Sequence, residues 1–310
     1  MADIKIFSIE KEIAEVIKGK DDVIKKVLAV IFAGGHVLLE DIPGVGKTTL
    51  AVAIARSMSL DYKRVQFTPD VLPSDIVGFS MYNNATKEFE YKEGAVFCNL
   101  FLADELNRTS PKTQSALLEV MEEGNVTVDG VTHKLPQPFV VIATENPIGS
   151  SGTQMLPDSQ LDRFMVCLSM GYPGHEDTIS FLKNIVNPPI NDVRPIITSD
   201  ELLFVRQTID EVNASDCILD YITTLIEATR TNEYISLGSS PRGAICLLKL
   251  SKAIALMNNH NYVTPEDIRF IFCDVLRHRI RLSGKAKAEG LDADTILLKI
   301  FDSTPVPKGN

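Results

Sequence analysis

Residues 37–49 decide the fold, and they are Val37-Leu38-Leu39-Glu40-Asp41-Ile42-Pro43-Gly44-Val45-Gly46-Lys47-Thr48-Thr49. A short apolar run is followed by a glycine-containing loop, and a helical pattern begins at Leu50. This order of strand, loop and helix is what a P-loop requires, because the N–H groups of the loop and the helix N-terminus together attract phosphate. The stretch therefore predicts a nucleoside triphosphate site in an α/β fold.

Each part of this loop has an expected task. Lys47 would reach the β- and γ-phosphates, and Thr48 would bind Mg²⁺. The full expected nucleotide-binding set is Pro43, Gly44, Val45, Gly46, Lys47, Thr48 and Thr49. The strict pattern has glycine at position 41, where this sequence has Asp41. The alternative, a tight turn that happens to contain Gly-Lys-Thr, is disfavoured by the flanking strand and helix patterns.

A second buried strand is predicted over 96–103, and it ends in Asp104 and Glu105. Functional groups collect at the carboxyl ends of parallel strands, where the P-loop also lies, so the two sites should meet. Asp104 would hold Mg²⁺ through water, and Glu105 would activate the attacking water as a general base. A pair of acidic residues on a solvated turn is the alternative.

Three further residues are candidates for contact with the γ-phosphate. Asn146 follows a buried strand predicted over 139–144, and its amide can both donate and accept. Arg163 precedes the last predicted strand, and Arg242 starts a predicted helix. An arginine stabilises the charge of a transferring phosphoryl group. Taken singly, the Asn fits an ordinary turn and each arginine fits a solvated or salt-bridged residue.

The bulk composition limits the classes of partner. The 310 residues are 45% hydrophobic, and 41 acidic against 31 basic residues give a formal charge of −10. This balance argues against broad nucleic-acid binding, which needs a basic footprint. The one basic cluster, 277–281, lies near a predicted helix C-terminus, where the helix dipole favours cations. That interpretation is preferred over a nucleic-acid-binding face.

The cysteines and the apolar segments predict a soluble, cytoplasmic protein. The five cysteines are far apart, odd in number and without a C-x-x-C, which favours a reduced protein with buried thiols. The five histidines have no ligand spacing, so no structural metal site is expected. The N-terminus lacks a signal-peptide layout, and the apolar stretch 27–39 is too short to span a membrane, so no direct membrane insertion is expected.

The chain is predicted to divide near residue 172. Residues 1–172 would form an α/β domain that begins with helices over 4–17 and 21–32 and carries hairpins at 79–91 and 126–134. Residues 173–310 would form a helical domain, with helices over 176–186, 199–213, 216–233, 241–258 and 265–278. Thr198 with Glu201, and Thr264 with Asp267, are helix-capping signatures.

The combination of a P-loop, a strand ending in Asp-Glu, a strand ending before Asn and two late arginines resembles the AAA+ ATPases. Seven segments resemble the MoxR family in particular: 68–78 (TPDVLPSDIVG), 103–108 (ADELNR), 117–123 (LLEVMEE), 143–147 (ATENP), 238–242 (GSSPR), 276–280 (LRHRI) and 304–307 (TPVP). The resemblance covers almost the whole chain. It implies a P-loop AAA+ parallel sheet flanked by helices, followed by a C-terminal all-α helical lid.

The resemblance also assigns roles. It implies that Asn146 is sensor 1, Arg163 the arginine finger, Arg242 sensor 2, and that Gly19 belongs to the segment that packs on adenine. The two hairpins resemble the helix-2 insert and the pre-sensor-1 insert. The implied cofactors are ATP and Mg²⁺.

MoxR proteins are regarded as chaperone-like ATPases that help to mature or assemble complexes with partners carrying von Willebrand factor A domains. The implied assembly is a ring, commonly a hexamer, because an arginine finger acts on the nucleotide of a neighbouring subunit. Two alternatives remain open: an AAA+ motor acting on nucleic acid, and a nucleotide-gated binding module that hydrolyses little. A small-molecule kinase also uses a P-loop, but Asn146 and Arg242 fit it poorly.

Overall fold

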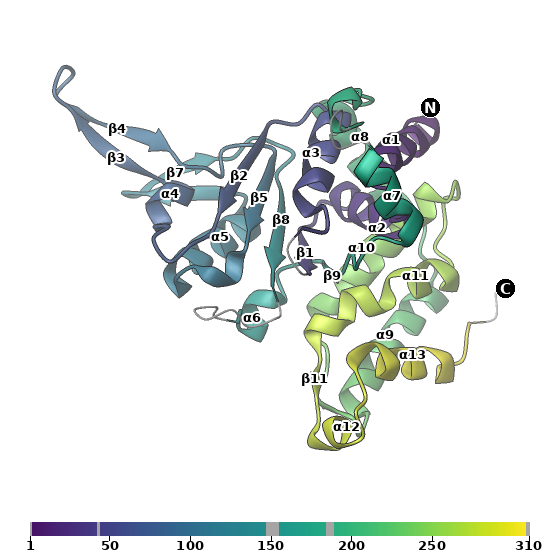
Figure 1. Cartoon of the computed structure of the whole chain (residues 1–310). Helices are drawn as coiled ribbons and strands as arrows, with labels where there is room; N and C mark the ends of the chain where they lie inside the picture. Colours follow the sequence, from purple (N-terminus) through teal and green to yellow (C-terminus); the bar gives the residue numbers. More distant parts are fainter. Residues whose placement is uncertain (1, 42–43, 147–154, 184–188, 308–310) are drawn as a thin grey trace.

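The computed structural model describes residues 2–41, 44–146, 155–183 and 189–307 of the chain. At its centre lies a five-stranded parallel sheet in the order β2–β5–β8–β1–β9 (Figure 1). The strands are β2 (Tyr62–Gln66), β5 (Leu100–Asp104), β8 (Val140–Glu145), β1 (Val37–Glu40) and β9 (Val166–Leu168). The predicted parallel sheet is confirmed, and β8 and β9 flank the strand that leads into the P-loop.

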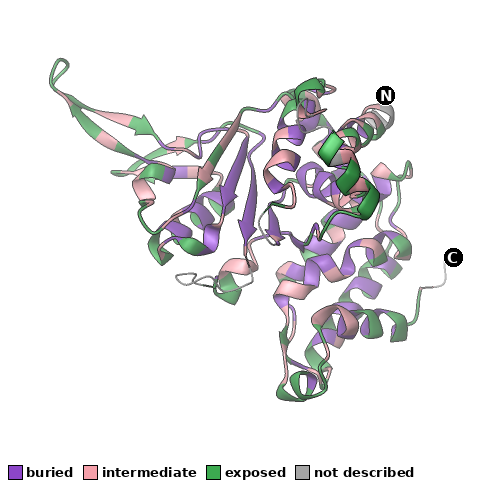
Figure 2. Ribbon diagram, viewed as in Figure 1, coloured by how far each residue is buried: buried purple, intermediate pink, exposed green. Residues whose placement is uncertain are grey.

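Each face of the sheet has its own hydrophobic core, because successive side chains of a strand point to opposite sides. Leu39, Leu102 and Ile142 belong to the core on one face. Their chain neighbours Leu38 and Phe101 belong to the core on the other. Covering on both faces explains why β1, β5, β8 and β9 are buried nearly throughout (Figure 2) and mostly apolar, whereas the edge strand β2 carries polar, partly exposed residues.

Helices cover the two faces. The first face carries α1 (Ala2–Val16), α2 (Asp21–Phe32) and α3 (Lys47–Ser57), and the second carries α4 (Pro73–Val77), the short 3₁₀ turn η1 (Leu106–Arg108), α5 (Pro111–Glu123) and α6 (Asp158–Leu161). Helix α5 starts as predicted, with the Ser110 hydroxyl accepting from the Thr113 N–H at 3.3 Å. It ends at Gly124, whose φ of 64° is the left-handed conformation that stops a helix.

Two β-hairpins extend from the sheet domain, as predicted. One consists of β3 (Gly78–Asn83) and β4 (Glu88–Glu93) and projects far from the body of the molecule (Figure 1). The other consists of β6 (Asn125–Val128) and β7 (Val131–Lys134). Its Asp129-Gly130 turn has φ values of 51° and 79°, the positive values that a two-residue hairpin turn requires.

The strand predicted over 96–103 is shorter than expected. Pairing begins only at Leu100, because the preceding residues turn towards α4: the Val96 N–H donates to the Ile76 carbonyl at 3.1 Å, and the Cys98 N–H donates back to Val96 at 2.8 Å. Val96 and Cys98 are nevertheless fully buried. The apolar run therefore correctly indicated burial, but the strand pairing predicted for residues 96–99 was wrong.

The C-terminal part is helical apart from one short ladder. Its elements are α7 (His175–Lys183), η2 (Pro189–Asp192), α8 (Ser199–Asp210), α9 (Asp216–Thr231), β10 (Ile235–Leu237), α10 (Pro241–Met257), α11 (Pro265–Leu276), η3 (Arg277–Arg279), β11 (Arg281–Leu282), α12 (Gly284–Ala288) and α13 (Ala293–Ser303). The antiparallel pair β10–β11 was not predicted, so the C-terminal part is helical with a short strand pair and not all-α. The helices α12 and α13 were not predicted either. Both predicted capping boxes, at Thr198 and Thr264, are confirmed.

The helical part shares a core with one face of the sheet. That core runs from the sheet through α1 and α2 into α8, α10 and α11. Arg206 of α8 also donates to the Ile31 carbonyl of α2 through Nε and a terminal nitrogen, at 3.1 and 3.0 Å. The domain boundary at residue 172 stays a prediction. In the part of the chain that the structure describes, none of the helices combines the length and apolar character needed to cross a membrane.

Candidate nucleotide-binding site

The described glycines of the loop between β1 and α3 have the backbone conformation that a phosphate-binding turn uses. Gly44 and Gly46 have φ values of 88° and 97°, a region that side-chain-bearing residues rarely adopt. Lys47 starts α3 and is only 8% exposed, and its Nζ donates to the Asp41 carbonyl at 2.8 Å. Pro43, which was predicted to contact nucleotide, lies outside the described residues.

The P-loop lysine and the acidic pair that follows β5 come together, as the sequence predicts. Burial lowers the pKa of Lys47, while the negative charges of Asp41, Asp104 and Glu105 act in the opposite direction. Thr48 and Thr49 are half-buried on the first turn of α3. A cation surrounded by carboxylates and helix N–H groups is suited to a phosphate with a bound divalent cation.

Thr144, a residue that the sequence did not single out, positions both acidic residues. Its hydroxyl donates to Asp104 Oδ1 at 2.7 Å and accepts from the Glu105 N–H at 2.8 Å. The second Asp104 oxygen accepts from Arg64 of β2 at 2.6 Å. The advance signals for Thr144 are its place at the end of the neighbouring strand and its membership of the segment 143–147, which resembles the MoxR family.

Glu105 has an unusual backbone. Its φ and ψ of 56° and 49° are left-handed, which is uncommon for a residue with a side chain and is found often at functional sites. The Glu105 carboxylate accepts from Arg108 at 2.5 Å. The side chain is thus held at the carboxyl edge of the sheet, beside the strand end that carries Asp104.

The end of β8 is also fixed by a buried amide. Asn107 is 5% exposed, and its Nδ2 donates to the Asn146 carbonyl at 3.2 Å. The preceding residue, Glu145, is buried, and burial together with the neighbouring charge of Glu40 raises its pKa to about 7. The predicted sensor Asn146 therefore follows a buried carboxyl group next to the P-loop strand.

A cavity of about 540 Å³ opens beside the loop, a volume within the usual range for small-molecule sites. It is lined by the end of α1 and the residues after it, by the P-loop, and by α7 and the segments flanking it: Glu15, Val16, Ile17, Lys18, Lys20, Gly44, Val45, Gly46, Thr49, Pro173, Asp177, Thr178, Ser180, Leu182, Pro189 and Ile190. Gly19, whose φ is 67°, lies between the lining residues Lys18 and Lys20. A side chain at this position would collide with the Asp177 carboxylate. The position predicted to pack on the base thus borders the cavity.

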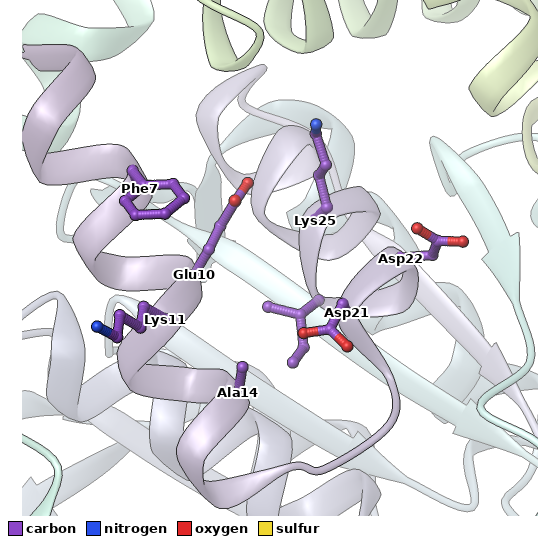
Figure 3. Close-up of a pocket in the computed structure, with 8 residues that line it drawn as sticks. Phe7, Glu10, Lys11, Ala14, Asp21, Asp22 and Lys25 are labelled. Atoms are coloured by element: carbon purple, nitrogen blue, oxygen red, sulfur yellow. The ribbon is translucent and has the colours of Figure 1, made fainter.

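A smaller cavity of about 260 Å³ lies between α1 and α2 (Figure 3). Acidic and basic side chains from both helices line it, and it includes none of the predicted site residues. The backbone N–H groups of a P-loop are also absent from its lining. Of the two cavities, only the larger one is therefore lined by P-loop residues.

The two predicted arginines, Arg163 and Arg242, pair with the same carboxylate, that of Glu122. Arg163 Nε is 3.3 Å from one Glu122 oxygen, and Arg242 donates to the other at 2.5 Å. Neither arginine lines the cavity at the P-loop. Arg242 thus shares a surface with Arg163, at the end of α5, in this chain.

The basic cluster at 277–281 joins the lid to the segment that carries Arg163. Arg279 is 7% exposed and donates to Asp162 Oδ1 at 2.8 Å, to the Phe164 carbonyl at 2.6 Å and to the Met165 carbonyl at 3.1 Å. His278 contacts the Phe164 carbonyl as well, at 3.1 Å. These contacts make His278 and Arg279 an internal link, whereas the side chain of Arg281 is exposed and pairs with Asp158.

The cysteine prediction is partly wrong. Cys98, Cys167 and Cys246 are buried, and burial raises the pKa of the Cys98 thiol to about 12. Cys217, however, is exposed at the start of α9, and Cys273 is half-buried. All five are free thiols.

The chain is similar to known ATPases in sequence. Residues 36–166 match the model for the ATPase family associated with various cellular activities, and residues 227–300 match the AAA lid domain. The uncharacterized protein YeaC of Bacillus subtilis is 47% identical, covering 96% of this chain and 93% of that protein. Chaperone MoxR1 of Mycobacterium tuberculosis is 34% identical over 96% of this chain and 81% of its own.

A solved structure shares the whole fold. The crystal structure of a candidate ATPase from Cytophaga hutchinsonii superposes with a TM-score of 0.92 at 39% identity, covering 99% of this chain and 96% of that one. Sequence and structure comparisons thus agree over nearly the full length, including both the sheet domain and the lid. The chain belongs to the MoxR family of AAA+ ATPases.

Proposed function

We propose that this ATPase hydrolyses Mg²⁺-ATP at the interface between subunits of a ring and uses the energy to remodel partner proteins. The observation that carries the proposal is that Lys47 lies within the electrostatic influence of Asp104, which Thr144 hydrogen-bonds, beside a cavity of about 540 Å³. Glu105 would orient and activate the attacking water, and Asn146 would contact the water or the γ-phosphate.

The residues present fit a magnesium ion. Asp104 offers carboxylate oxygens that each accept a single hydrogen bond, and Thr48 offers a hydroxyl on the first turn of α3. Mg²⁺ prefers oxygen ligands and keeps several waters, so two protein ligands with the phosphates suffice. When bound, the ion would neutralise charge on the phosphate oxygens. Thr48 and Asp104 are its proposed holders.

The two arginines support a site completed by a neighbour. Membership of the AAA+ family indicates an oligomeric assembly, and we propose a hexameric ring. Arg163 would act as the arginine finger on the nucleotide of the adjacent subunit, and Arg242, which pairs with the same carboxylate, would act as sensor 2.

A chaperone-like role fits the relatives named MoxR and chaperone MoxR1. We propose that it consists in maturing or assembling protein complexes together with partners that carry von Willebrand factor A domains. The free thiols fit a reducing compartment, for which we propose the cytoplasm. The acidic formal charge of −10 favours protein partners over nucleic acid.

The test is a trap. The Glu105→Gln variant should bind ATP normally, turn over poorly and retain its partner, so a pull-down with this variant plus ATP identifies the partner by mass spectrometry. The same variant with ADP is the control. DNA binding that is lost with added salt and that raises the ATPase rate would instead support a nucleic-acid motor. An unmodified protein that binds ATP without turnover would support the nucleotide-gated module.

A further inference from the structure

Asp41 stands where the strict P-loop pattern has glycine, and its carboxylate is buried, with the residue 7% exposed. A buried carboxylate is stable only with hydrogen-bond donors. The donors to this one all come from one segment directly after β9: the Ser169 hydroxyl at 3.2 Å, the Met170 N–H, and the Gly171 N–H at 3.3 Å. The P-loop is therefore bonded through this side chain to residues 169–171.

The segment 169–171 is where the chain leaves the sheet for the lid. Strand β9 ends at Leu168, and α7 begins at His175. Gly171 has φ of 61°, so the chain changes direction there. The next carbonyl, that of Tyr172, accepts from Lys20 Nζ at 2.9 Å, and Lys20 itself lines the cavity. The junction thus contacts both the P-loop, through Asp41, and a residue that lines the neighbouring cavity, Lys20.

The other end of Asp41 contacts the residue that binds phosphate. Its carbonyl oxygen accepts from Lys47 Nζ at 2.8 Å. A phosphate in the loop would compete for this ammonium group, because a charge-assisted bond to phosphate is stronger than one to a neutral carbonyl. One residue therefore contacts the phosphate-sensing lysine with its backbone and the lid junction with its side chain.

We propose that Asp41 is a positioning residue that transmits occupancy of the P-loop to the lid through the Ser169–Gly171 junction. The inference rests on the proposed function in one respect, namely that nucleotide phosphate binds at Lys47. Glycine, the usual residue at this position, has the same carbonyl but no carboxylate. It would keep the contact to Lys47 and lose the bonds to Met170 and Gly171, so the substitution separates the two contacts.

The experiment measures lid position and nucleotide affinity separately in the full chain. Spin labels are placed on Cys217, which is exposed in the lid, and on a cysteine introduced at the exposed Lys112 of α5, with Cys273→Ser to avoid a third label. The inter-label distance is measured by pulsed electron paramagnetic resonance without nucleotide and with saturating ADP and Mg²⁺. Affinity is measured with a fluorescent ADP analogue.

In the unsubstituted chain the distance should change when ADP binds. In Asp41→Gly the affinity should change by less than about tenfold, the equivalent of one hydrogen bond. The nucleotide-dependent distance change should fall by roughly half or more, since the coupling contact is gone. Asp41→Asn, which keeps one acceptor oxygen, should lie between the two.

Two results would overturn the inference. One is a full distance change in Asp41→Gly; the other is a loss of affinity beyond about tenfold with the distance change intact, which would place Asp41 in the phosphate site. If Asp41→Gly does not fold, Ser169→Ala decides: it removes one donor and should reduce the distance change without altering affinity, and an unaltered distance change counts against the link. No ADP binding by the unsubstituted chain would reject the proposed function instead.

Discussion

The P-loop region and the arginine pair differ in how far they are buried and held by hydrogen bonds within the chain. Lys47 and Asp104 are 8% and 9% exposed, and their hydrogen bonds come from several elements of the same chain. Arg163 and Arg242 have side chains 29% and 39% exposed and share one carboxylate, that of Glu122. The first region is nearly complete within one subunit. The second presents two cations at a surface, as a group that completes another molecule's site would.

The two regions are connected through the short strand β9. Before the strand, Arg279 holds Asp162 and Phe164, the neighbours of Arg163. After the strand, Asp41 holds Met170 and Gly171. The two regions therefore differ in exposure although both are attached to the same strand, β9. Four substitutions test the regions separately.

The largest effect is expected from Arg163→Ala. If the arginine acts on a neighbour's nucleotide, kcat should fall by about 10³-fold or more, as for other arginine fingers. Mixing Arg163→Ala with Glu105→Gln subunits should restore part of the ATPase rate, because one interface in the mixture combines an intact finger with an intact Glu105. Arg269→Ala, at an exposed pair with Asp302, is the control and should change little. Mixtures without any recovery would contradict action across subunits.

The next largest effect is expected from Arg279→Met. Loss of this buried guanidinium removes a donor from the Asp162 carboxylate and from four backbone carbonyls, at a cost of about 3–5 kcal/mol in unfolding free energy. Urea denaturation measures it. The matched control is Arg281→Met, two residues on, whose ion pair with Asp158 is exposed and should contribute less than about 1 kcal/mol. Equal losses in the two variants would refute Arg279 as the support of the Arg163 segment.

A third prediction concerns the P-loop side, where burial and Glu40 raise the pKa of Glu145 from 4.5 to about 7. Between pH 4.5 and 7 the folded state keeps a proton that the unfolded state has released, so stability should fall as pH rises through this window and level off above it. The loss is on the order of 3 kcal/mol. Unfolding of the wild type and of Glu145→Gln across this range measures it, and the variant should lack this component. An unchanged pH profile would show that the Glu145 carboxyl ionises normally.

The smallest effect is expected from Glu122→Gln. Its carboxylate competes with phosphate for both arginines, and exposed ion pairs contribute up to about 1 kcal/mol each. At protein concentrations where assembly is incomplete, the ATPase rate should therefore rise by roughly two- to fivefold. Glu123→Gln, the adjacent exposed residue on α5, is the control. A lower rate in Glu122→Gln alone would mean that the carboxylate positions the arginines instead of competing for them.

Local signals predicted most of the framework. The capping residues Ser110, Thr198 and Thr264 start helices where expected, because a cap is a bond between residues three apart. The Asp129-Gly130 turn formed for the same reason. The start of β5 was missed, since apolar residues such as Val96 can be buried without pairing. Helix α13 was missed although its buried residues have helical spacing.

The sequence by itself determined the fold class, the family and the residues at the P-loop and the strand ends, because these depend on order along the chain. Only the tertiary structure showed that Thr144 aligns both acidic residues, that Glu122 holds both arginines and that Asp41 bonds to the lid junction. Each of these contacts joins residues at least 39 positions apart, and no spacing rule predicts a contact of that range. The residue that looked like a departure from the P-loop pattern is explained by a partner that lies beyond the last strand.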